Sequence, residues 1–188
     1  MKINRYGNFY IQRMKWNYDK NTDTEYIDFD NDSRPIDIEK NYDCIYSECK
    51  GIEDVGQAKN IHTESYADSD FLRTYIPKKI MHEATDITLT LYFIGDRRQE
   101  NLRRFIDNIS GGSPKRETRT YGNPYRYYDK IRKKGFDFVY VETTSVEEDN
   151  WKGSLPYIKV SFKLKNIYGV ASTERKIYPE NYETIVNE

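Results

Sequence analysis

The chain of 188 residues carries 30 lysines and arginines against 31 aspartates and glutamates, so its net charge is only −1. This balance argues against intrinsic disorder and against a protein whose main task is to grip nucleic acid, because both classes usually show an excess of one charge. The apolar fraction of 37% suffices for one core, and the 18 tyrosines suit half-buried sheets and interfaces.

No apolar run approaches the roughly 20 residues that a membrane-spanning helix requires. The start of the chain, MKINRYGNFYIQRMKW, shows no apolar segment of the kind found in a signal peptide. We therefore expect a soluble protein without membrane insertion. Cys44 and Cys49 are the only cysteines, too few for a disulfide scaffold, so we expect both to be reduced.

The first 80 residues contain short strand candidates that are separated by turns rich in Asn and Asp. These strand candidates are residues 9–11, 25–29, 44–48 and 72–76. Turn-like sequences lie at residues 21–24 and 31–33. We find no internal repeat and no long linker in this part of the chain.

The second half begins with a clear strand signal at residues 86–94 (DITLTLYFI). Ile87, Leu89, Leu91 and Phe93 fall on one face, while threonines and a tyrosine fill the other. This alternation predicts an antiparallel strand with one buried face and one half-solvated face.

A helix is predicted to follow over residues 97–109. Asp96 and Gln99 have the spacing of a capping box, and Gly111-Gly112 would end the helix. The apolar side chains recur at i, i+3, i+4 and i+7, which places one stripe against a core. This stripe consists of Leu102, Phe105, Ile106 and Ile109.

Beyond the helix, residues 113–121 (SPKRETRTY) carry no periodic pattern and are predicted to form a mobile loop. Residues 125–129 predict a short strand, and residues 136–141 (FDFVYV) predict a central strand because both faces are apolar. Residues 147–153 (EEDNWKG) are predicted to form a turn. Residues 156–166 then give the clearest strand of all, with Ile, Val, Phe and Leu alternating with Lys and Ser.

The order of these elements predicts a β-rich α+β fold: an antiparallel β-sandwich or split barrel with one packed α-helix at about residues 97–109. We expect a core domain with the strand-helix-strand unit over residues 71–170. Residues 1–70 would form a β-rich segment that is part of the same domain or an extension of it. Residues 171–188 would form a polar C-terminal arm or tail.

No set of residues nominates an active site, and we expect no catalysis, no cofactor and no metal. His62 and His82, taken with Cys44 and Cys49, match no spacing that is typical of a zinc site. Neither cysteine lies in a local signature of a catalytic nucleophile. The acidic residues are spread through turns, and no pair of them stands out as an acid–base couple.

One partial match to a calcium loop remains. Asp28, Asp30, Asp32 and Glu39 occupy positions 1, 3, 5 and 12 of a twelve-residue calcium loop. Ser33 stands where such a loop requires glycine, and neither flank has a helical pattern. An acidic, solvated turn between strands is the better interpretation.

Residues 97–134 are locally basic and contain interleaved tyrosines. Such a stretch can bind a single nucleic-acid strand by stacking and backbone contacts, or it can form a subunit interface, in which Arg and Tyr are enriched. We favour the interface, because the acidic residues 19–32 and 142–149 could meet it on a neighbouring copy. The basic residues are Arg97, Arg98, Arg103, Arg104, Lys115, Arg116, Arg119, Arg126, Lys130, Arg132, Lys133 and Lys134, and the tyrosines are Tyr121, Tyr125, Tyr127 and Tyr128.

Five segments of the second half come in an informative order. They are Thr74-Tyr75-Ile76-Pro77, the alternating strand at residues 85–95, the helix at residues 96–110, Tyr127-Tyr128-Asp129 and the closing strand at residues 157–169. Over about residues 71–170, this arrangement resembles tailed-phage tail proteins related to the distal tail protein and the tail tube subunit.

The resemblance implies a virion structural protein: a ring-forming subunit of a phage tail, of the distal tail or baseplate hub type, that links the tail tube to the tip and surrounds the DNA channel. Members of that group form six-fold rings. The implied partners are further copies of the chain in a hexameric ring and the neighbouring tail tube and tail-tip proteins, with DNA only in transit. The implied location is the virion tail, and the host cytoplasm during assembly.

The resemblance also implies which segments make contacts in a ring, namely the loop at residues 113–123 and the two termini. By its length, we expect the chain to lack the large carbohydrate-binding-like second domain of the longer distal tail proteins. Two alternatives stay open. One is a tail tube or tail-completion/connector subunit, because these proteins share folds. The other is a single-stranded nucleic-acid-binding module that uses residues 97–134.

Overall fold

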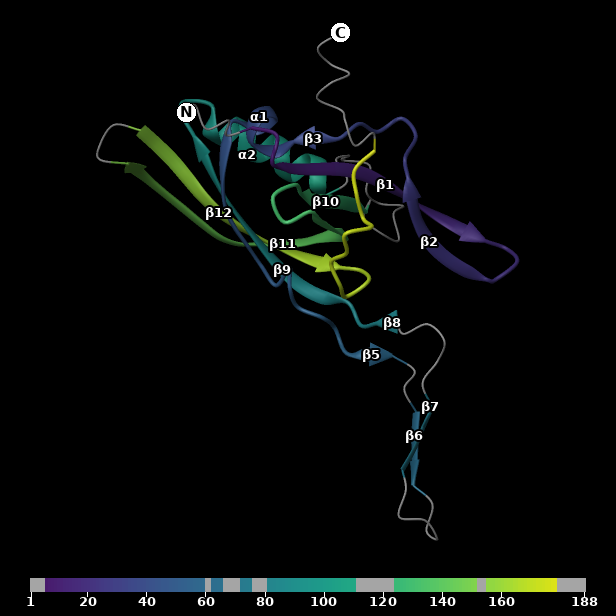
Figure 1. Cartoon of the computed structure of the whole chain (residues 1–188). Helices are drawn as coiled ribbons and strands as arrows, with labels where there is room; N and C mark the ends of the chain where they lie inside the picture. The colour runs from purple at the N-terminus through teal and green to yellow at the C-terminus, as the bar shows by residue number, and fades with distance from the viewer. Residues whose placement is uncertain are drawn as a thin grey trace.

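The computed structural model describes residues 6–59, 62–65, 72–75, 81–110, 124–151 and 155–178. Figure 1 shows the elements in these parts of the chain. They are β1 (Phe9–Asp19), β2 (Thr24–Phe29), β3 (Ile36–Asp37), α1 (Ile38–Tyr42), β4 (Cys44–Lys50), β5 (Ala58–Lys59), β6 (His62–Ser65), β7 (Leu72–Tyr75), β8 (Met81–His82), β9 (Thr85–Ile94), α2 (Arg98–Ile109), β10 (Tyr125–Asp129), β11 (Lys134–Trp151) and β12 (Leu155–Asn166).

One antiparallel sheet of eight strands organises the molecule. Its order is β2-β1-β10-β11-β12-β9-β4, with β3 paired to β1 as well. Two further pairs, β5–β8 and β6–β7, lie outside this sheet. The β-rich α+β prediction is confirmed. Strands from the first third of the chain lie at both ends of a sheet whose centre comes from the second half. The domain boundaries at residues 70 and 170 stay predictions, as does the choice between sandwich and split barrel.

The sheet curls until its two ends approach each other. Phe9 of β1 stacks on Tyr46 of β4, with ring centroids 3.7 Å apart. The short helix α1 leads into β4, and the Glu39 carboxylate accepts the backbone N–H of Tyr46 at 2.9 Å. The helix begins at Asp37, whose side chain caps its first turn, and ends at Asp43 with a left-handed φ of 44°. The prediction of one helix missed α1, because five residues are too few to show a recurring helical pattern of apolar side chains.

The core lies on the inner face of the sheet, where α2 packs (Figure 1). Phe105 of α2 is 0% exposed, and its ring lies 5.1 Å from the rings of Tyr42 and Phe162 and 5.9 Å from that of Phe93. The alternating patterns of the two clearest strands are confirmed, because their predicted inward residues are buried in this core. These residues are Ile87, Leu89, Leu91 and Phe93 of β9 and Ile158, Val160, Phe162 and Leu164 of β12.

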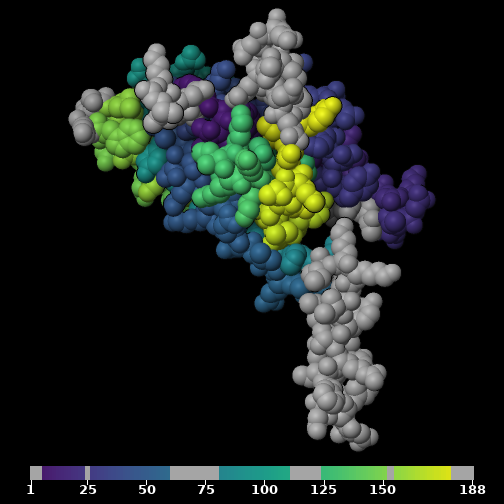
Figure 2. All heavy atoms as spheres, in the orientation of Figure 1, coloured from purple at the N-terminus to yellow at the C-terminus, as the bar shows by residue number. Residues whose placement is uncertain are grey.

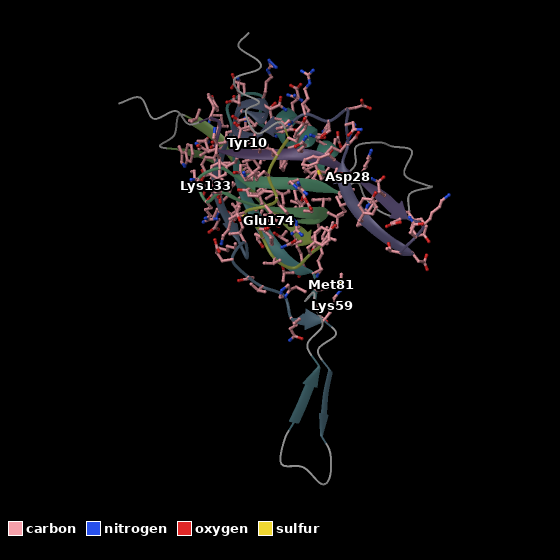
Figure 3. All side chains as sticks on the ribbon, turned by 45° about the vertical axis from the view of Figure 1, so that its right-hand side comes forward. Tyr10, Asp28, Lys59, Met81, Lys133 and Glu174 are labelled. Carbon is pink, nitrogen blue, oxygen red and sulfur yellow. The ribbon has the colours of Figure 1, made fainter. Side chains whose placement is uncertain are left out.

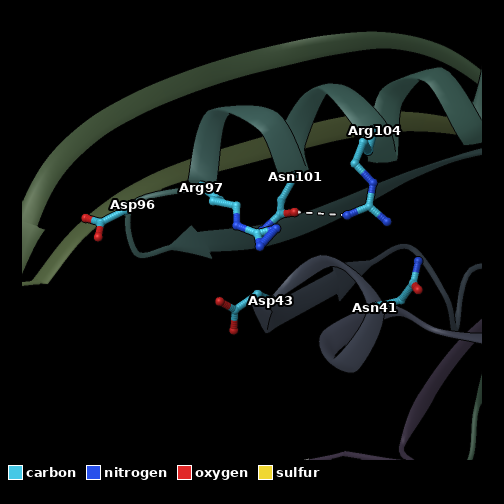
Figure 4. A pocket seen from close by; sticks show the side chains of 6 residues that line it. All are labelled: Asn41, Asp43, Asp96, Arg97, Asn101 and Arg104. Atoms are coloured by element: carbon cyan, nitrogen blue, oxygen red, sulfur yellow. Dashed lines mark hydrogen bonds between the residues drawn. The ribbon is translucent and has the colours of Figure 1, made fainter.

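The predicted helix is confirmed as α2, but its predicted start is wrong in detail. The N-cap residue is Arg97, and no side chain makes a cap hydrogen bond there. Asp96 lies inside a tight turn in which the N–H of Arg98 bonds to the carbonyl of Gly95 at 3.3 Å. Figure 4 shows the Asp96 carboxylate directed away from the helix. The turn therefore takes the place of the capping box with Gln99, and the predicted stop at residues 111–112 lies outside the described residues.

The predicted apolar stripe of α2 faces the core, but its four side chains are buried to different extents. Phe105 and Ile109 are fully buried, whereas Leu102 and Ile106 are partly buried against the same core. Asn101 is also buried, although its amide does not belong to an apolar stripe. The helix therefore has one firmly packed half and one half that borders solvent.

β11 is longer than predicted. Residues 147–151, which were predicted to belong to a turn, continue the strand, and Trp151 still pairs with Leu155. The turn prediction is wrong for these residues, because this half of the hairpin extends past the core. Its side chains are exposed and polar, so the hydrophobic alternation disappears while the backbone ladder continues. Residues 152–154 lie outside the described residues.

The remaining strand predictions are confirmed. Residues 9–11, 25–29, 44–48 and 72–75 lie in β1, β2, β4 and β7, and residues 125–129 form β10. Residues 136–141 lie in β11, which is central because it pairs with both β10 and β12. Residue 76 and the predicted loop at residues 113–121 lie outside the described residues.

After β12, residues 170–178 cross the outer face of the sheet. Ser172 forms an isolated antiparallel bridge with Gly135 of β11, and the backbone of Tyr178 bonds to the side chain of Gln12 in β1. Figure 2 shows this segment in yellow on the surface, beside residues of the N-terminal part and of β10 and β11. Residues 179–188 lie outside the described residues.

The core assignment predicts that Phe105→Ala lowers the free energy of unfolding by about 3–5 kcal/mol, because it removes a fully buried ring and leaves a cavity. Urea denaturation followed by circular dichroism measures this loss. Arg103→Ala, at an exposed position of the same helix, is the control and should change stability by less than about 0.5 kcal/mol. Equal losses for the two variants would contradict the assignment.

Candidate assembly surfaces

A ribbon of paired strands projects from the connection between β4 and β9. At its base β5 pairs with β8, placing Lys59 opposite Met81, and beyond it β6 pairs with β7, placing Thr63 opposite Thr74. We call these two pairs the arm. Figures 1 and 3, which differ by a 45° turn, both show the arm leaving the body, with β6 and β7 the outermost of the described elements.

The base of the arm is held firmly on the body. The N–H of Gly56 bonds to the carbonyl of Gly169 at 2.8 Å, and the N–H of Glu83 bonds to the carbonyl of Gln57 at 2.8 Å. The Nδ1 atom of His82 lies 2.9 Å from the carbonyl oxygen of Gly56. A Cβ atom at Gly56 or Gly169 would lie only 2.0 or 1.8 Å from the carbonyl oxygen of Glu83, so both positions require glycine. The root of the arm is therefore closely packed.

The outer part of the arm has a different character. A two-stranded ribbon alone is at best marginally stable in water, because it buries little surface. β6 and β7 pair with each other, and Figures 1 and 3 show them apart from the other described elements. A closely packed root thus carries a two-stranded ribbon away from the other described elements.

β11 offers an open strand edge. β10 pairs with it only as far as Phe138, whereas β12 pairs with it as far as Trp151. Within the described parts of the chain, residues 139–151 therefore have a strand on one side only. Two register shifts, between Tyr140 and Glu142 and between Thr143 and Ser145, interrupt this edge. Bulges and charges of this kind limit indiscriminate pairing while leaving room for a specific partner.

Three aromatic side chains gather on the outer face at the far end of this hairpin. The ring centroids of Trp151 and Tyr157 lie 5.0 Å apart, and each lies 5.5 Å from that of Tyr92 in β9. Trp151 remains 38% exposed. Trp and Tyr are the side chains that most often dominate the energy of a protein interface. We call these three residues the aromatic cluster.

A polar pocket of about 410 Å³ lies between the end of α1 and the start of α2 (Figure 4). Its lining combines opposite charges with amides, and the Oδ1 atom of Asn101 accepts a hydrogen bond from Arg104 at 3.2 Å. Among the described residues that line it there is no histidine, cysteine or hydroxyl group, and its only carboxylates are those of Asp43 and Asp96. The lining residues are Asn41, Asp43, Asp96, Arg97, Asn101 and Arg104.

The basic and aromatic residues of β10 do not share one surface. Tyr125 and Tyr127 point into the core, whereas Arg126 lies on the outer face, where it forms a buried ion pair with Asp137 at 2.7 Å. The alternation of the strand causes this separation. Two of the tyrosines expected to stack on nucleic acid are therefore inaccessible.

Other basic residues of the stretch have acidic partners within the chain. Arg98 donates from Nε to Glu148 of β11 at 3.0 Å, and Lys134 pairs with Glu53. The described residues that were considered for single-strand binding thus lie in different places: some are on α2, some are buried in the core, and some are held in separate ion pairs. Its residues Lys115, Arg116, Arg119 and Tyr121 lie outside the described residues.

The residues considered as metal ligands have other partners. Asp30 pairs with Arg13 at 2.7 Å, Asp28 accepts a hydrogen bond from Asn17, and Glu39 bonds to the backbone of β4. Within the described ranges, no group of three or more His, Cys, Asp or Glu side chains is placed to hold a metal ion.

Both cysteines are buried thiols. The Sγ atom of Cys44 lies 3.4 Å from the carbonyl oxygen of Ile38. Burial raises the pKa of the Cys49 thiol from 9.0 to about 12. A thiol with such a pKa forms almost no thiolate near neutral pH, so Cys49 is not suited to act as a nucleophile.

Sequence patterns identified one strand of the arm and missed its partner. Residues 72–76 were predicted as a strand, but β6 (HTES) has no apolar alternation and gave no signal. The usable signal was weaker: two short β-prone runs on either side of the turn-forming sequence ADSD at residues 67–70. The sequence did not reveal the open edge of β11, because residues 147–151 were predicted to belong to a turn and instead continue the strand.

In the described residues no helix is both long and apolar enough to cross a membrane.

No family model matches the chain, and no curated protein matches it. Among solved structures, the Dit (gp 19.1) protein of SPP1 is similar with a TM-score of 0.35 and 14% sequence identity. Its structure is described as a paradigm of the hub adsorption apparatus in phages that infect Gram-positive bacteria. The similarity covers 81% of this chain and 49% of that one, so this chain spans about half the length of that protein. A similarity of this extent does not assign the chain to a family.

The burial of both thiols predicts that a thiol-specific reagent at mildly alkaline pH modifies the native protein at least about a hundredfold more slowly than the unfolded chain. Absorbance of the released chromophore measures both rates. Ser47→Cys places a third thiol at an exposed position of β4 and should react rapidly in the native protein. Rapid reaction of the native protein without this substitution would contradict the placement of Cys49.

Proposed function

We propose that the chain is a virion structural protein: a ring-forming subunit of a phage tail, of the distal tail or baseplate hub type. In this role it surrounds the DNA channel and links the tail tube to the tip. The proposal begins from the resemblance in element order over residues 71–170 and is supported by the surfaces described above. It requires assembly rather than catalysis, so neither a cofactor nor an active site is needed.

The arm is the observation that carries the proposal. Its root is packed so closely that two glycines are required, yet its outer pair lies beyond the other described elements. A ribbon of this kind gains stability only when another surface covers it. In a ring, the neighbouring subunit supplies that surface.

A cyclic ring also needs two different surfaces on each subunit, because the contact between neighbours is head-to-tail. The arm and the far end of the β11–β12 hairpin meet this requirement, because they leave the body on opposite sides in Figure 1. The hairpin contributes the open edge of β11, the aromatic cluster and the exposed acids Glu147 and Glu148. One surface of each subunit would then face the other surface of the next.

A tail tube or tail-completion subunit could use the same surfaces, since both must form rings. The distal position is favoured here by the sequence resemblance alone. The single-strand binding alternative has lost its main support, because Tyr125 and Tyr127 are buried and Arg98 and Lys134 have acidic partners.

The test of the proposal is the native mass of the purified full chain, measured by light scattering on a sizing column and followed by negative-stain imaging. We expect a species of about six subunits with a central hole. A monomer that persists at every accessible concentration, and that does not add to isolated tails, would contradict the proposal.

Replacing residues 60–80 by a short Gly-Ser turn should abolish ring formation, because it removes the outer part of the arm. The melting temperature should hold, since the bonds of Gly56 and Glu83 at the root remain. Light scattering and thermal denaturation measure the two effects. Asn31→Ala, in the exposed turn between β2 and β3, is the matched control and should assemble normally.

Trp151→Ala should raise the concentration of half-assembly at least about tenfold, because the substitution removes an exposed anchor from the aromatic cluster. Ile131→Ala removes an exposed apolar side chain from the β10–β11 turn and serves as the control. If the two variants assemble alike, the cluster does not belong to the interface.

A further inference from the structure

Three polar side chains form a row across the outer face of the sheet. The strand register places Gln12 of β1 opposite Arg126 of β10, and Arg126 opposite Asp137 of β11. They are only 1%, 9% and 1% exposed. Arg126 donates to both carboxylate oxygens of Asp137, at 2.7 and 3.0 Å. Polar side chains on the outside of a sheet are normally solvated, so this row indicates a cover.

The cover is residues 170–178, which we call the strap. It crosses the strands in the order β11, β10, β1. Ser172 exchanges two backbone hydrogen bonds with Gly135, at 3.0 and 2.9 Å. The carbonyl of Lys176 accepts from Arg126 at 3.1 Å. The side-chain amide of Gln12 then bonds to both the N–H and the carbonyl of Tyr178, each at 2.8 Å.

Two side chains of the strap complete its attachment. Arg175 lies 3.5 Å from the carboxylate of Asp137, and its guanidinium lies 4.1 Å from the centroid of the Tyr168 ring. Ile177 is 4% exposed and is the strap's buried apolar anchor. β11 presents glycine where the strap crosses, since a Cβ atom at Gly135 would lie 2.0 Å from the carbonyl oxygen of Arg175. The outer face thus provides a fitted docking site, which we call the groove, for a strap that turns at residues 172–175 and then crosses to β1.

The strap can leave the groove without exposing unpaired charges to an apolar environment, because the side chains beneath it are polar. If the strap leaves, Gln12, Arg126 and Asp137 meet water, which satisfies polar groups, and the ion pair of Arg126 keeps its partner. The apolar core on the inner face stays covered by α2. The cost of removal consists of the strap's own hydrogen bonds, its charge contact, the burial of Ile177, the contact of the Tyr178 ring with Phe29 and the packing of Ala171 against the edge of the core.

The strap leaves the body beside the root of the arm. Gly169 precedes it with a left-handed φ of 67°, and its carbonyl accepts the N–H of Gly56. A change in the path of the chain after Gly169 would redirect the strap without disturbing β12. The point at which the strap departs and the root of the projecting arm therefore share one packed contact.

We propose that the strap is exchanged between copies, so that the groove formed by Gln12, Arg126, Asp137 and Gly135 holds residues 170–178 of a second copy. A segment identical to the chain's own strap reproduces every contact described above, which is the basis of domain swapping. The inference rests on the proposed function, because exchange would tie neighbouring subunits of a ring together. It identifies the partner of this groove as the C-terminal segment of another subunit.

The test mixes two full-length variants. Ile177→Asp disables the strap by placing a charge at its buried anchor and leaves the groove intact. Gln12→Ala weakens the groove and leaves the strap intact. A tagged Ile177→Asp chain should capture untagged Gln12→Ala chain, because the intact strap of one fits the intact groove of the other. We expect at least about tenfold more capture than with an untagged chain that carries both substitutions.

Equal capture of the single and the double variant, or no capture of either, would overturn the exchange. Circular dichroism confirms that each variant folds, and Ile177→Ser takes the place of Ile177→Asp if the latter does not. As a second measurement, a labelled peptide with the sequence of residues 170–178 should bind the Ile177→Asp chain saturably. A scrambled peptide should not bind, and the absence of binding by the true sequence would also overturn the inference.

The native mass of the unmodified chain separates the two proposals. A ring that forms while strap-dependent capture is absent overturns the exchange and leaves the proposed function standing. A chain that stays monomeric and does not add to isolated tails, but whose variants show the capture, overturns the ring and leaves the exchange standing.

Discussion

The rest of the structure depends on the antiparallel pairing of β12 with both of its neighbours. β12 pairs with β9 from Tyr157 to Asn166 and with β11 from Leu155 to Asn166, so it has a strand on both sides from Tyr157 onward. Its inward residues form the floor on which α2 packs, and the pairing carries β11 beyond the core as an open edge. The arm precedes β9, and the strap follows β12. Each candidate assembly surface is therefore an extension of one rigid ladder.

The two faces of the sheet have different chemistry, and this difference separates folding from assembly. The inner face is apolar and is covered by α2, so Phe105 and its ring contacts stabilise the folded chain. The outer face carries the polar row of Gln12, Arg126 and Asp137, together with the aromatic cluster at its far end. Contacts on the outer face can form and break while α2 continues to cover the inner face, as a subunit that folds before it assembles would require.

The sequence predicted those parts of the fold in which side-chain alternation reports burial. Ile87 to Phe93 and Ile158 to Leu164 alternate because one face of each strand meets the core. The same rule fails for Glu147 to Trp151, which form a strand without meeting a core, and for β6, where backbone pairing alone defines the ribbon. For residues 97–134, a count of charges and rings along the chain cannot show that Tyr127 points inward while its neighbour Arg126 pairs with Asp137 across the sheet. The strand register decides which side chains lie next to one another on a face of the sheet, and this register is known only once the sheet has folded.

The position of Gly169 connects the arm with the strap. Its carbonyl bonds to Gly56 at the root of the arm, and the strap begins at the next residue. A neighbour that binds the arm would hold this junction in place, so that the strap leaves the body from a fixed point. Conversely, a strap docked on a neighbour would restrain Gly169, and through its hydrogen bond to Gly56 it would restrain the root of the arm. Two contacts that are individually weak would then form together, because each lowers the conformational entropy that the other must overcome. In the proposed ring, the arm and the strap would act as one bivalent connection between neighbouring subunits, and disabling either would weaken the ring by more than its own contacts contribute.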